Sequence, residues 1–434
     1  MTTVSPSPPP APASRPPVVE RPHPLEWCRD NLFSNWFSGL VTILTGLVLL
    51  NLVQGFWTWS TTEAQWRIIP ANFHLILAGR FPPDQYWRLW LLMALLSTLA
   101  GLTWGWLGRR SAHFFRLGVL VGLALAALLL TIAPAQNLVP PQLLPADAGE
   151  AAGETGAARL LATILSLSLL VFLTLGALLG RLWDRWISQV SLNPVLPIAW
   201  PIAFLISLWL IRGGLGLPVV STSDWSGLLL TVFLALISII LCFPLGVLLA
   251  LGRQSSLPAI RWLSTLHIEV IRGVPLIAIL FMGQVMIPLF LPEGMRPDRV
   301  LRAIVGLTLF SAAYMAENIR GGLQAVPQGQ VEAASALGLN SPLTVGLVVL
   351  PQALKISIPA IVGQFISLFQ DTTLLSIVGL LELLGLSRAV LANPDFVGRS
   401  AEIYCFIGLL YWGFCYAMSL GSRRLEEVLN TEHR

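Results

Sequence analysis

Charged residues are scarce in this chain of 434 residues, of which they make up only 11%, against roughly 25% in a typical soluble domain. Hydrophobic residues make up 55%, and the mean hydropathy is +0.75. The net charge of +4 comes from basic residues scattered between apolar runs, which does not describe a nucleic-acid surface. This composition indicates a polytopic membrane protein in a lipid bilayer, with no nucleic-acid partner.

Lysine is nearly absent, since Lys355 is the single one. A phosphate-binding GxxxxGK[ST] loop requires a Gly-Lys pair, so this chain carries no such nucleotide site. Neither HExxH nor GxSxG occurs. The cysteines are far apart and lack metal-ligand spacing; they are Cys28, Cys242, Cys405 and Cys415. We expect no metal site, no cofactor and no enzyme chemistry in this chain.

Long apolar runs dominate the rest of the sequence. Ten runs approach the ~20 residues that cross a bilayer, with eight or nine as alternative counts. They lie at 37–58, 88–107, 117–134, 159–182, 195–212, 227–252, 266–291, 301–319, 356–385 and 402–421. The ninth run is broken by Gly379 and Gly385, which predicts a bend or a re-entrant turn. The expected fold class is all-α, with about ten spans.

The distribution of basic residues predicts the orientation. Arg109, Arg110 and Arg116 share one short loop, whereas residues 135–158 contain no lysine or arginine. Because short basic loops mark the cytosolic side, the N-terminal tail is expected in the cytosol. Counting the spans from there also places residues 330–351 and the C-terminal tail in the cytosol.

The stretch at 330–351 is polar and small-sided, although it lies between apolar runs. A stripe with i, i+3, i+4 spacing lets another surface approach the backbone; it is formed by Ala333, Ala336 and Leu337. Gly338 is placed to end a helix in a left-handed conformation, and Asn340-Ser341-Pro342 supplies a new helix start. A short helix at 331–337, a sharp turn and a second helix are predicted. A plain helical hairpin between two spans would share these features.

Ionisable residues concentrate in the second half of the chain, at or beside the spans. Glu269 and Arg272 are three residues apart on one predicted helix face, and Glu317 and Arg320 repeat that spacing. Tyr314 lies one turn before Glu317. Charged groups at membrane depth normally face a bundle interior or a water-filled route. Ion pairs that anchor span ends remain the alternative to substrate contact.

A third polar group could line a route for a zwitterion. It consists of Gln364, Gln370, Asp371, Thr372, Thr373 and Glu382. Helix capping by Asp371 is the alternative interpretation. Residues 1–215, by contrast, contain apolar runs and no motif that indicates chemistry.

Together these motifs closely resemble the polar amino-acid branch of binding-protein-dependent ABC permeases. The resemblance is carried by EVIRGVPLI, AAYMAENIRGGLQAVPQGQVEAASALGL and VVLPQALKISIPAIVGQFISLFQDTTLLSIVGLLELL. It covers roughly residues 227–421, about half of the chain. The long N-terminal half is similar to the M-type subunit of general L-amino-acid importers. Gln370 departs from the pattern, since related sequences usually carry lysine there.

The resemblance implies a five-helix type I importer core in the C-terminal half of a subunit that imports L-amino acids across the bacterial inner membrane. It also implies two ATPase subunits that hold ATP and magnesium, a second and non-identical permease chain, and a periplasmic binding protein. Both termini would be cytosolic. The expected divisions are a proline-rich tail (1–34), extra helices (35–215), the permease core (216–422) with its EAA coupling loop (330–351), and a C-terminal tail (423–434).

The family pattern also implies residue roles. Glu332 would be the charged contact to the ATPase, while Ala333 and Ala334 would permit close packing. Gly338 would form the turn before Leu339, and Leu350-Pro351 would fix the following helix. The implied substrate path contains Tyr314, Glu317, Gln364, Gln370, Asp371, Thr372 and Thr373, and the implied structural ion pairs involve Glu269, Arg272 and Arg320.

Two other classes of membrane protein are alternatives to this interpretation. An ion-coupled secondary amino-acid transporter would work without an ATPase, and such proteins often contain inverted repeats. The sequence shows no convincing repeat, and the spacing of the EAA stretch would have no explanation. A membrane scaffold that transports nothing would not explain why the polar residues gather, in motif order, in one half of the chain.

Overall fold

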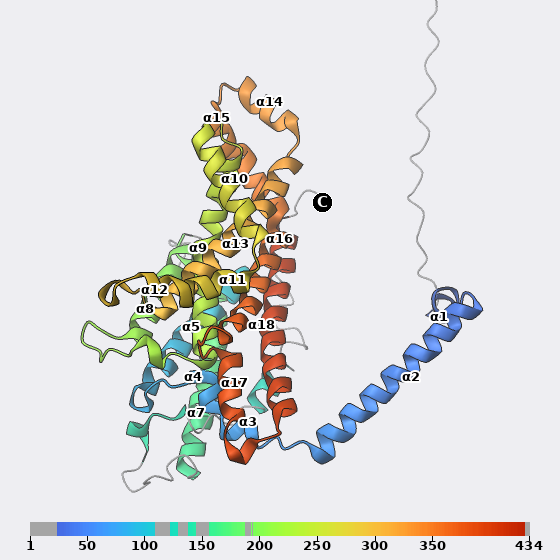
Figure 1. Cartoon of the computed structure of the whole chain (residues 1–434), viewed down its shortest axis with the longest axis vertical. Helices are drawn as coiled ribbons and strands as arrows, with labels where there is room; N and C mark the ends of the chain where they lie inside the picture. The colour runs from blue at the N-terminus through green and yellow to red at the C-terminus, as the bar shows by residue number, and fades with distance from the viewer. Residues whose placement is uncertain are drawn as a thin grey trace, which may run out of the picture. The chain divides into compact units, whose positions relative to one another are not determined.

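The computed structural model describes residues 24–108, 122–128, 138–144, 156–186, 192 and 194–429. In these residues the chain is helical and forms no β-strand, which confirms the all-α fold class (Figure 1). The chain divides into two compact units, Met1–Ala64 and Gln65–Arg434. The expected divisions at residues 34 and 215 therefore do not coincide with the boundary between packing units.

The first unit contains α1 (Pro24–Leu32) and α2 (Trp36–Thr58). The side chain of Asn35 caps α2 by accepting a hydrogen bond from the backbone N–H of Ser38 at 2.8 Å. No residue of α2 is buried within the chain, and apolar side chains surround the whole helix. A helix without a polar face is suited to lipid and not to water. α2 is therefore suited to cross a membrane with apolar side chains on every face.

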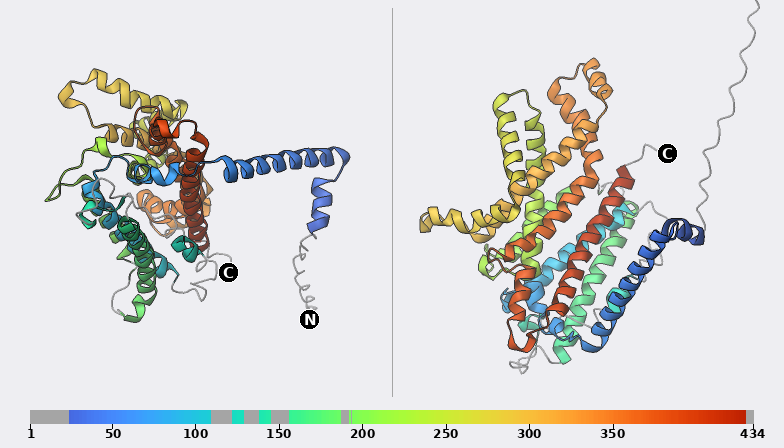
Figure 2. Two further views of the ribbon diagram at one scale, coloured as in Figure 1. Left: turned by 90° about the horizontal axis from the view of Figure 1, so that it is seen from below. Right: turned by 45° about the vertical axis from the view of Figure 1, so that its right-hand side comes forward.

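The second unit contains the other described helices, which come from an N-terminal part and a C-terminal part of the chain (Figure 2). Its N-terminal part comprises α3 (Ile68–Ala71), α4 (Phe73–Ala78), α5 (Tyr86–Leu107), α7 (Gly156–Trp186) and α8 (Leu196–Arg212). Its C-terminal part comprises α9 (Gly227–Arg253), α10 (Pro258–Gly273), α11 (Leu276–Phe281), α12 (Ile287–Phe290), α13 (Arg299–Ala325), α14 (Gln328–Ala336), α15 (Ser341–Leu343), α16 (Leu350–Asp371), α17 (Leu383–Leu391) and α18 (Ser400–Leu429).

Glycines bring the backbones of α5 and α7 into direct contact. A Cβ atom added to Gly101 or Gly105 would overlap backbone atoms of α7, and one added to Gly176 or Gly180 would overlap backbone atoms of α5. In each helix the two glycines are four residues apart and so lie on one face. This is the small-xxx-small pattern by which membrane helices approach closely, because lipid supplies little hydrophobic drive for association.

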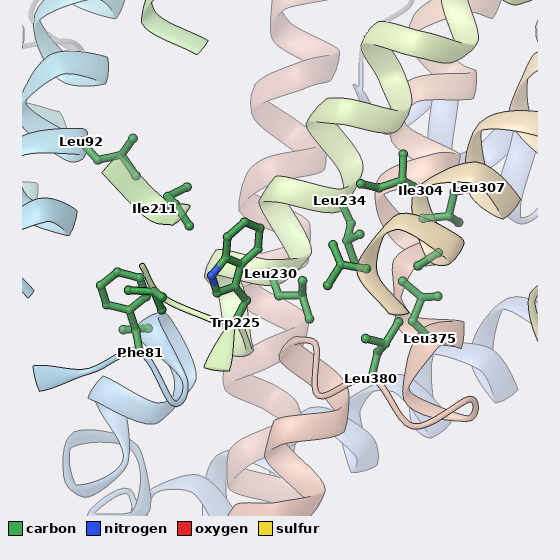
Figure 3. Packing of buried hydrophobic residues seen from close by; sticks show 14 of the residues in the cluster. Phe81, Leu92, Ile211, Trp225, Leu230, Leu234, Ile304, Leu307, Leu375 and Leu380 are labelled. Carbon is green, nitrogen blue, oxygen red and sulfur yellow. The ribbon is translucent and has the colours of Figure 1, made fainter. Parts of the chain in front are cut away.

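Residues of the N-terminal and C-terminal parts of the second unit pack together in one apolar cluster. Figure 3 shows Trp225 between two groups of this cluster. Phe81, Leu92 and Ile211 form one group, and Leu230, Leu234, Ile304, Leu307, Leu375 and Leu380 form the other. The described residues around α4, α5 and α8 are thus bound to the C-terminal part through buried side chains.

Seven helices in the described residues are long and apolar enough to cross a membrane, and one bent pair raises the number to eight. Five of these eight lie in the C-terminal part, which is the expected five-helix core. α8 has 17 residues, which is short for a span. The expected span at 117–134 lies largely outside the described residues.

Two expected spans have a different form in the structure. The run at 266–291 is not one straight span, because α10 and α11–α12 meet at an angle of 103°. Val274 is extended and Pro275 precedes α11, which ends the helix as expected for a residue before proline. The run at 356–385 begins earlier, at Ser341, and leaves helical structure after Ser376. Gly379, where a bend or a re-entrant turn was predicted, has a φ of 84° and lies in this non-helical segment.

The contact between α5 and α7 can be tested with Gly105→Leu. The leucine side chain has no room against Ala177, so we expect a loss of about 1–3 kcal/mol of stability. This would lower the midpoint of thermal unfolding in mild detergent. Gly408→Leu in α18 is the matched control, because nothing lies within 4 Å of a Cβ atom at that position. Equal midpoints for the two variants would contradict the backbone contact.

Candidate functional site

A helical knob projects from one end of the second unit, formed by α14 and the turn that follows it (Figure 1). α14 ends at Ala336, and Gly338 has a φ of 81°, so the predicted left-handed turn is confirmed. The side-chain oxygen of Asn340 then accepts from the N–H of Leu343 at 3.1 Å and starts the next helix. The predicted order of short helix, sharp turn and second helix is therefore present.

The exposed face of the knob differs in part from the expected one. Ala333 and Ala336 are exposed, and Leu337 is 82% exposed, so the predicted stripe faces outward. Ala334 is only 4% exposed, however, and packs against this chain itself. Glu332 is exposed but lies in the second turn, because the helix begins at Gln328, directly after Pro327. Helix-dipole stabilisation in the first turn therefore does not apply to Glu332.

The residues after the knob lead without interruption into α16. A π-helical segment spans Thr344–Val349, and Pro351 lies in the first turn of α16. Proline has no N–H to donate to the preceding turn, which fits a widened turn before it. Leu350 is half-buried, Pro351 is exposed, and Leu339 donates its N–H to the carbonyl of Ala334 at 3.1 Å.

A cluster of charges joins α9, α10 and α13 at the end of the unit that carries the knob; we call it the arginine–glutamate cluster. It consists of Arg253, Glu269, Arg272, Glu317 and Arg320. One carboxylate oxygen of Glu317 lies 2.8 Å from Arg253 Nη1, and the other lies 2.7 Å from Arg320 Nη2 and 3.6 Å from Arg272 Nη1. The side chain of Glu317 is 14% exposed. Three arginines and two glutamates leave one net positive charge.

The expected pair of Glu269 and Arg272 does not form. Glu269 pairs with Arg253 at 2.8 Å, and Arg272 pairs with Glu317 instead. Both side chains of α10 thus find their partners on neighbouring helices, which sequence spacing alone does not reveal. The pairing of Glu317 with Arg320 is as predicted. Arg253 was missed, although a basic residue in the last turn of an apolar helix is a recognisable signal.

Tyr314 flanks the same cluster. Its ring lies 5.4 Å from the guanidinium carbon of Arg272 and packs on Phe310 with ring centroids 4.8 Å apart. The arginines occupy both carboxylate oxygens of Glu317, so the structure places this residue in an ion-pair cluster that ties helices together.

The polar residues of α16 and its C-terminal end do not form one continuous surface. Gln364 is 9% exposed, whereas Gln370 is exposed and its amide lies 3.6 Å from Cys415 Sγ. The hydroxyl groups of Thr372 and Thr373 donate to carbonyls within the same segment, those of Phe369 and Gln370.

The carboxylates of Asp371 and Glu382 differ in whether they cap a helix. Asp371 makes no side-chain capping hydrogen bond, so the capping interpretation is wrong for it. Glu382 is the residue that caps a helix. It is fully buried, and it accepts from the N–H groups of Leu384 and Gly385 at 2.8 and 2.7 Å at the start of α17.

The comparisons with known proteins agree in class. Residues 242–426 match the family model of the binding-protein-dependent transport system inner membrane component. The chain is 35% identical to the inner membrane amino-acid ABC transporter permease protein YhdY of Escherichia coli K12, over 99% of both chains. It is also 35% identical to the glutamate/glutamine/aspartate/asparagine transport system permease protein BztC of Rhodobacter capsulatus, over 97% of both.

A solved structure, described as a crystal structure of an amino acid ABC transporter with histidines, is 30% identical to this chain. The alignment covers 46% of this chain and 91% of that one, with a TM-score of 0.42.

The arginine–glutamate cluster predicts unequal effects of removing its two carboxylates. Glu317→Ala removes a carboxylate partner from three guanidinium groups, of which Arg253 keeps Glu269 and Arg320 keeps the amide oxygen of Gln324, and we expect it to cost about 1–3 kcal/mol. Glu269 is 57% exposed and has one arginine partner, so Glu269→Ala should cost about 1 kcal/mol or less. Thermal unfolding of both purified variants measures the difference. A smaller effect of Glu317→Ala than of Glu269→Ala would contradict a central role for Glu317.

Proposed function

This chain belongs to the amino-acid ABC transporter permeases, and we propose that it is the membrane-spanning subunit of an ATP-driven importer of L-amino acids. The observation that carries the proposal is the exposed knob at 328–338, with its small side chains facing outward. The alignment of two amino-acid permeases along nearly the whole chain supports the substrate class. A permease of this class moves its substrate and is not an enzyme.

In this proposal the knob docks into a cleft on a separate ATPase. Ala333 and Ala336 let the backbone approach the partner surface, Leu337 supplies an apolar anchor, and Glu332 supplies a charge at the rim. ATP and magnesium belong to the partner, because this chain has no Gly-Lys phosphate-binding loop. Two such ATPase subunits would serve one complex.

The remaining partners and the placement follow from the same proposal. A second, non-identical permease chain would complete the pathway, and a periplasmic binding protein would deliver the amino acid. The protein would lie in the bacterial inner membrane. The knob must meet an ATPase where ATP is present, so its end of the unit would be cytosolic, together with both termini.

The candidate substrate path is proposed in a narrower form than the sequence suggested. Gln364 and Gln370 keep amide groups that are not used in capping, and Asp371 keeps a carboxylate without a capping role. Thr373 contributes a hydroxyl oxygen beside them, whereas Thr372 is fully buried and would support the path from behind. Glu317 and Tyr314 would act on the path indirectly, by fixing α13 against α10.

Gly338→Asp tests the coupling role of the knob. The substitution meets no neighbouring atom within 4 Å but places a side chain at a φ of 81°. We expect uptake to fall at least about tenfold, with the protein still in the membrane, because the variant places a charged side chain on the exposed turn of the knob, in a conformation that favours glycine. Gly398→Asp is the matched control, since Gly398 also has a positive φ, of 82°, and open space around a Cβ atom, but lies outside the knob. Uptake at the wild-type rate in Gly338→Asp would refute the coupling role.

The energy source separates this proposal from an ion-coupled secondary transporter. Uptake of labelled amino acids is measured in cells or vesicles with ATP depleted while the ion gradient is maintained. We expect uptake to collapse, and we expect a nucleotide-hydrolysing subunit to co-purify with the wild-type chain in mild detergent. Continued uptake by the chain alone after reconstitution would replace the ABC importer with the secondary transporter.

A further inference from the structure

A cavity of about 190 Å³ lies at the opposite end of α13 from the knob. Three loop or helix-start segments of the C-terminal part form most of it: residues 221–225, 298–300 and 379–381. The fourth contribution is Arg80, which follows α4 in the N-terminal part. α13 has 27 residues, so about 40 Å separate the cavity from the knob at roughly 1.5 Å per residue.

The charged residues that line the cavity differ in whether they have partners within the protein. The carboxylate of Asp298 accepts from the N–H of Val300 at 2.8 Å and from the hydroxyl of Thr222, so it is committed within the protein. The guanidinium groups of Arg80 and Arg299 are exposed, and neither makes an ion pair or a hydrogen bond with another described residue. Of the residues that line the cavity, Arg80 and Arg299 are cations and Asp298 is an anion, which leaves one net positive charge; Asp224 belongs to the same loop but does not line the cavity.

The polar lining adds more groups able to bind an oxygen-rich ligand. Ser221 and Ser223 share a hydrogen bond of 2.8 Å at the rim. Gly379 has a φ of 84° and carries no side chain, which keeps that wall open. Trp225 and Leu380 line the cavity and also belong to the hydrophobic cluster of Figure 3, so part of the lining is apolar. An apolar lining with a few convergent polar groups is typical of small-ligand sites.

The size of the cavity limits its occupant. Pockets for drug-sized ligands measure roughly 300–1,000 Å³, and this one is smaller. It can hold a free amino acid or one side chain of a docked protein. Arginine binds carboxylates through planar, two-point hydrogen bonding. Two unpaired guanidinium groups in one small cavity therefore fit a ligand with two carboxylates better than a neutral zwitterion, and the positive field would attract such an anion from solution.

We propose that this cavity, lined by Arg80 and Arg299, is a binding site for acidic amino acids at the outer mouth of the permease. The proposal rests on the proposed import function, and it adds a substrate preference and a second site far from the knob. An acidic amino acid would place its two carboxylates on the two arginines before it moves inward.

Uptake by the complete transporter tests this site. L-Glutamate and its uncharged isostere L-glutamine are compared at concentrations below saturation, in the wild type and in Arg80→Gln and Arg299→Gln. We expect each variant to lower glutamate uptake at least about tenfold while glutamine uptake stays within about twofold of wild type. Arg299→Lys keeps the charge but loses two-point binding, so its glutamate uptake should lie between those of the wild type and Arg299→Gln. Arg296→Gln is the matched control, because Arg296 is exposed nearby but does not line the cavity.

Other outcomes overturn the site without affecting the import function. If both variants take up glutamate at the wild-type rate, the two arginines do not bind the ligand. Equal losses for glutamate and glutamine would indicate a structural role or the docking of an acidic side chain from the binding protein. If the wild-type complex imports no amino acid at all, the proposed import function fails together with the site. Thermal unfolding of each variant separates loss of folding from loss of binding.

Discussion

The carboxylate of Glu317 holds three helices in fixed relation at the end of the molecule that carries the knob. Arg253 reaches it from α9, Arg272 from α10, and Arg320 from the next turn of α13. Unpaired guanidinium groups so close to a bilayer are costly, so these helix ends cannot separate without breaking several charged contacts at once. Only Val326 and Pro327 separate α13 from α14, so the knob is joined closely to the helix that carries this carboxylate.

Close contacts at glycines also hold α9, α13 and α16 together. A Cβ atom at Gly246 would overlap Met315 across the α9–α13 contact, and one at Gly322 would overlap Ser357 and Ala353 across the α13–α16 contact. Contacts of this kind depend on the register of both helices, because sliding one helix brings a larger side chain onto the neighbouring backbone. α9, α13 and α16 are therefore expected to move as one body. The bend of 103° between α10 and α11–α12 is a break in regular helix beside that body.

Features set by local chemistry could be predicted from the sequence, and those set by packing could not. The positive φ of Gly338 and the cap made by Asn340 depend on neighbouring residues, so sequence analysis predicted both. Pro275 also carried a local signal, although the apolar run around it concealed the bend. The partners of Glu269 and Arg272 are different, because i, i+3 spacing permits a pair but neighbouring helices decide it. The cavity was invisible for the same reason, since its walls come from four separate segments.

The N-terminal segment is part of the end of the molecule opposite the knob and is not a detached addition. Ile68 and Ile76 pack in one apolar cluster with residues of α17 and α18. Glu402 in α18 is 2% exposed, and its carboxylate accepts from the backbone N–H of Gln65 at 3.0 Å, with Arg399 3.7 Å away. A buried carboxylate needs such donors, so a permease core that lacks Gln65 would lose this hydrogen bond to Glu402. The N-terminal segment therefore also packs against α17 and α18, and its Arg80 lines the cavity together with residues of the C-terminal part.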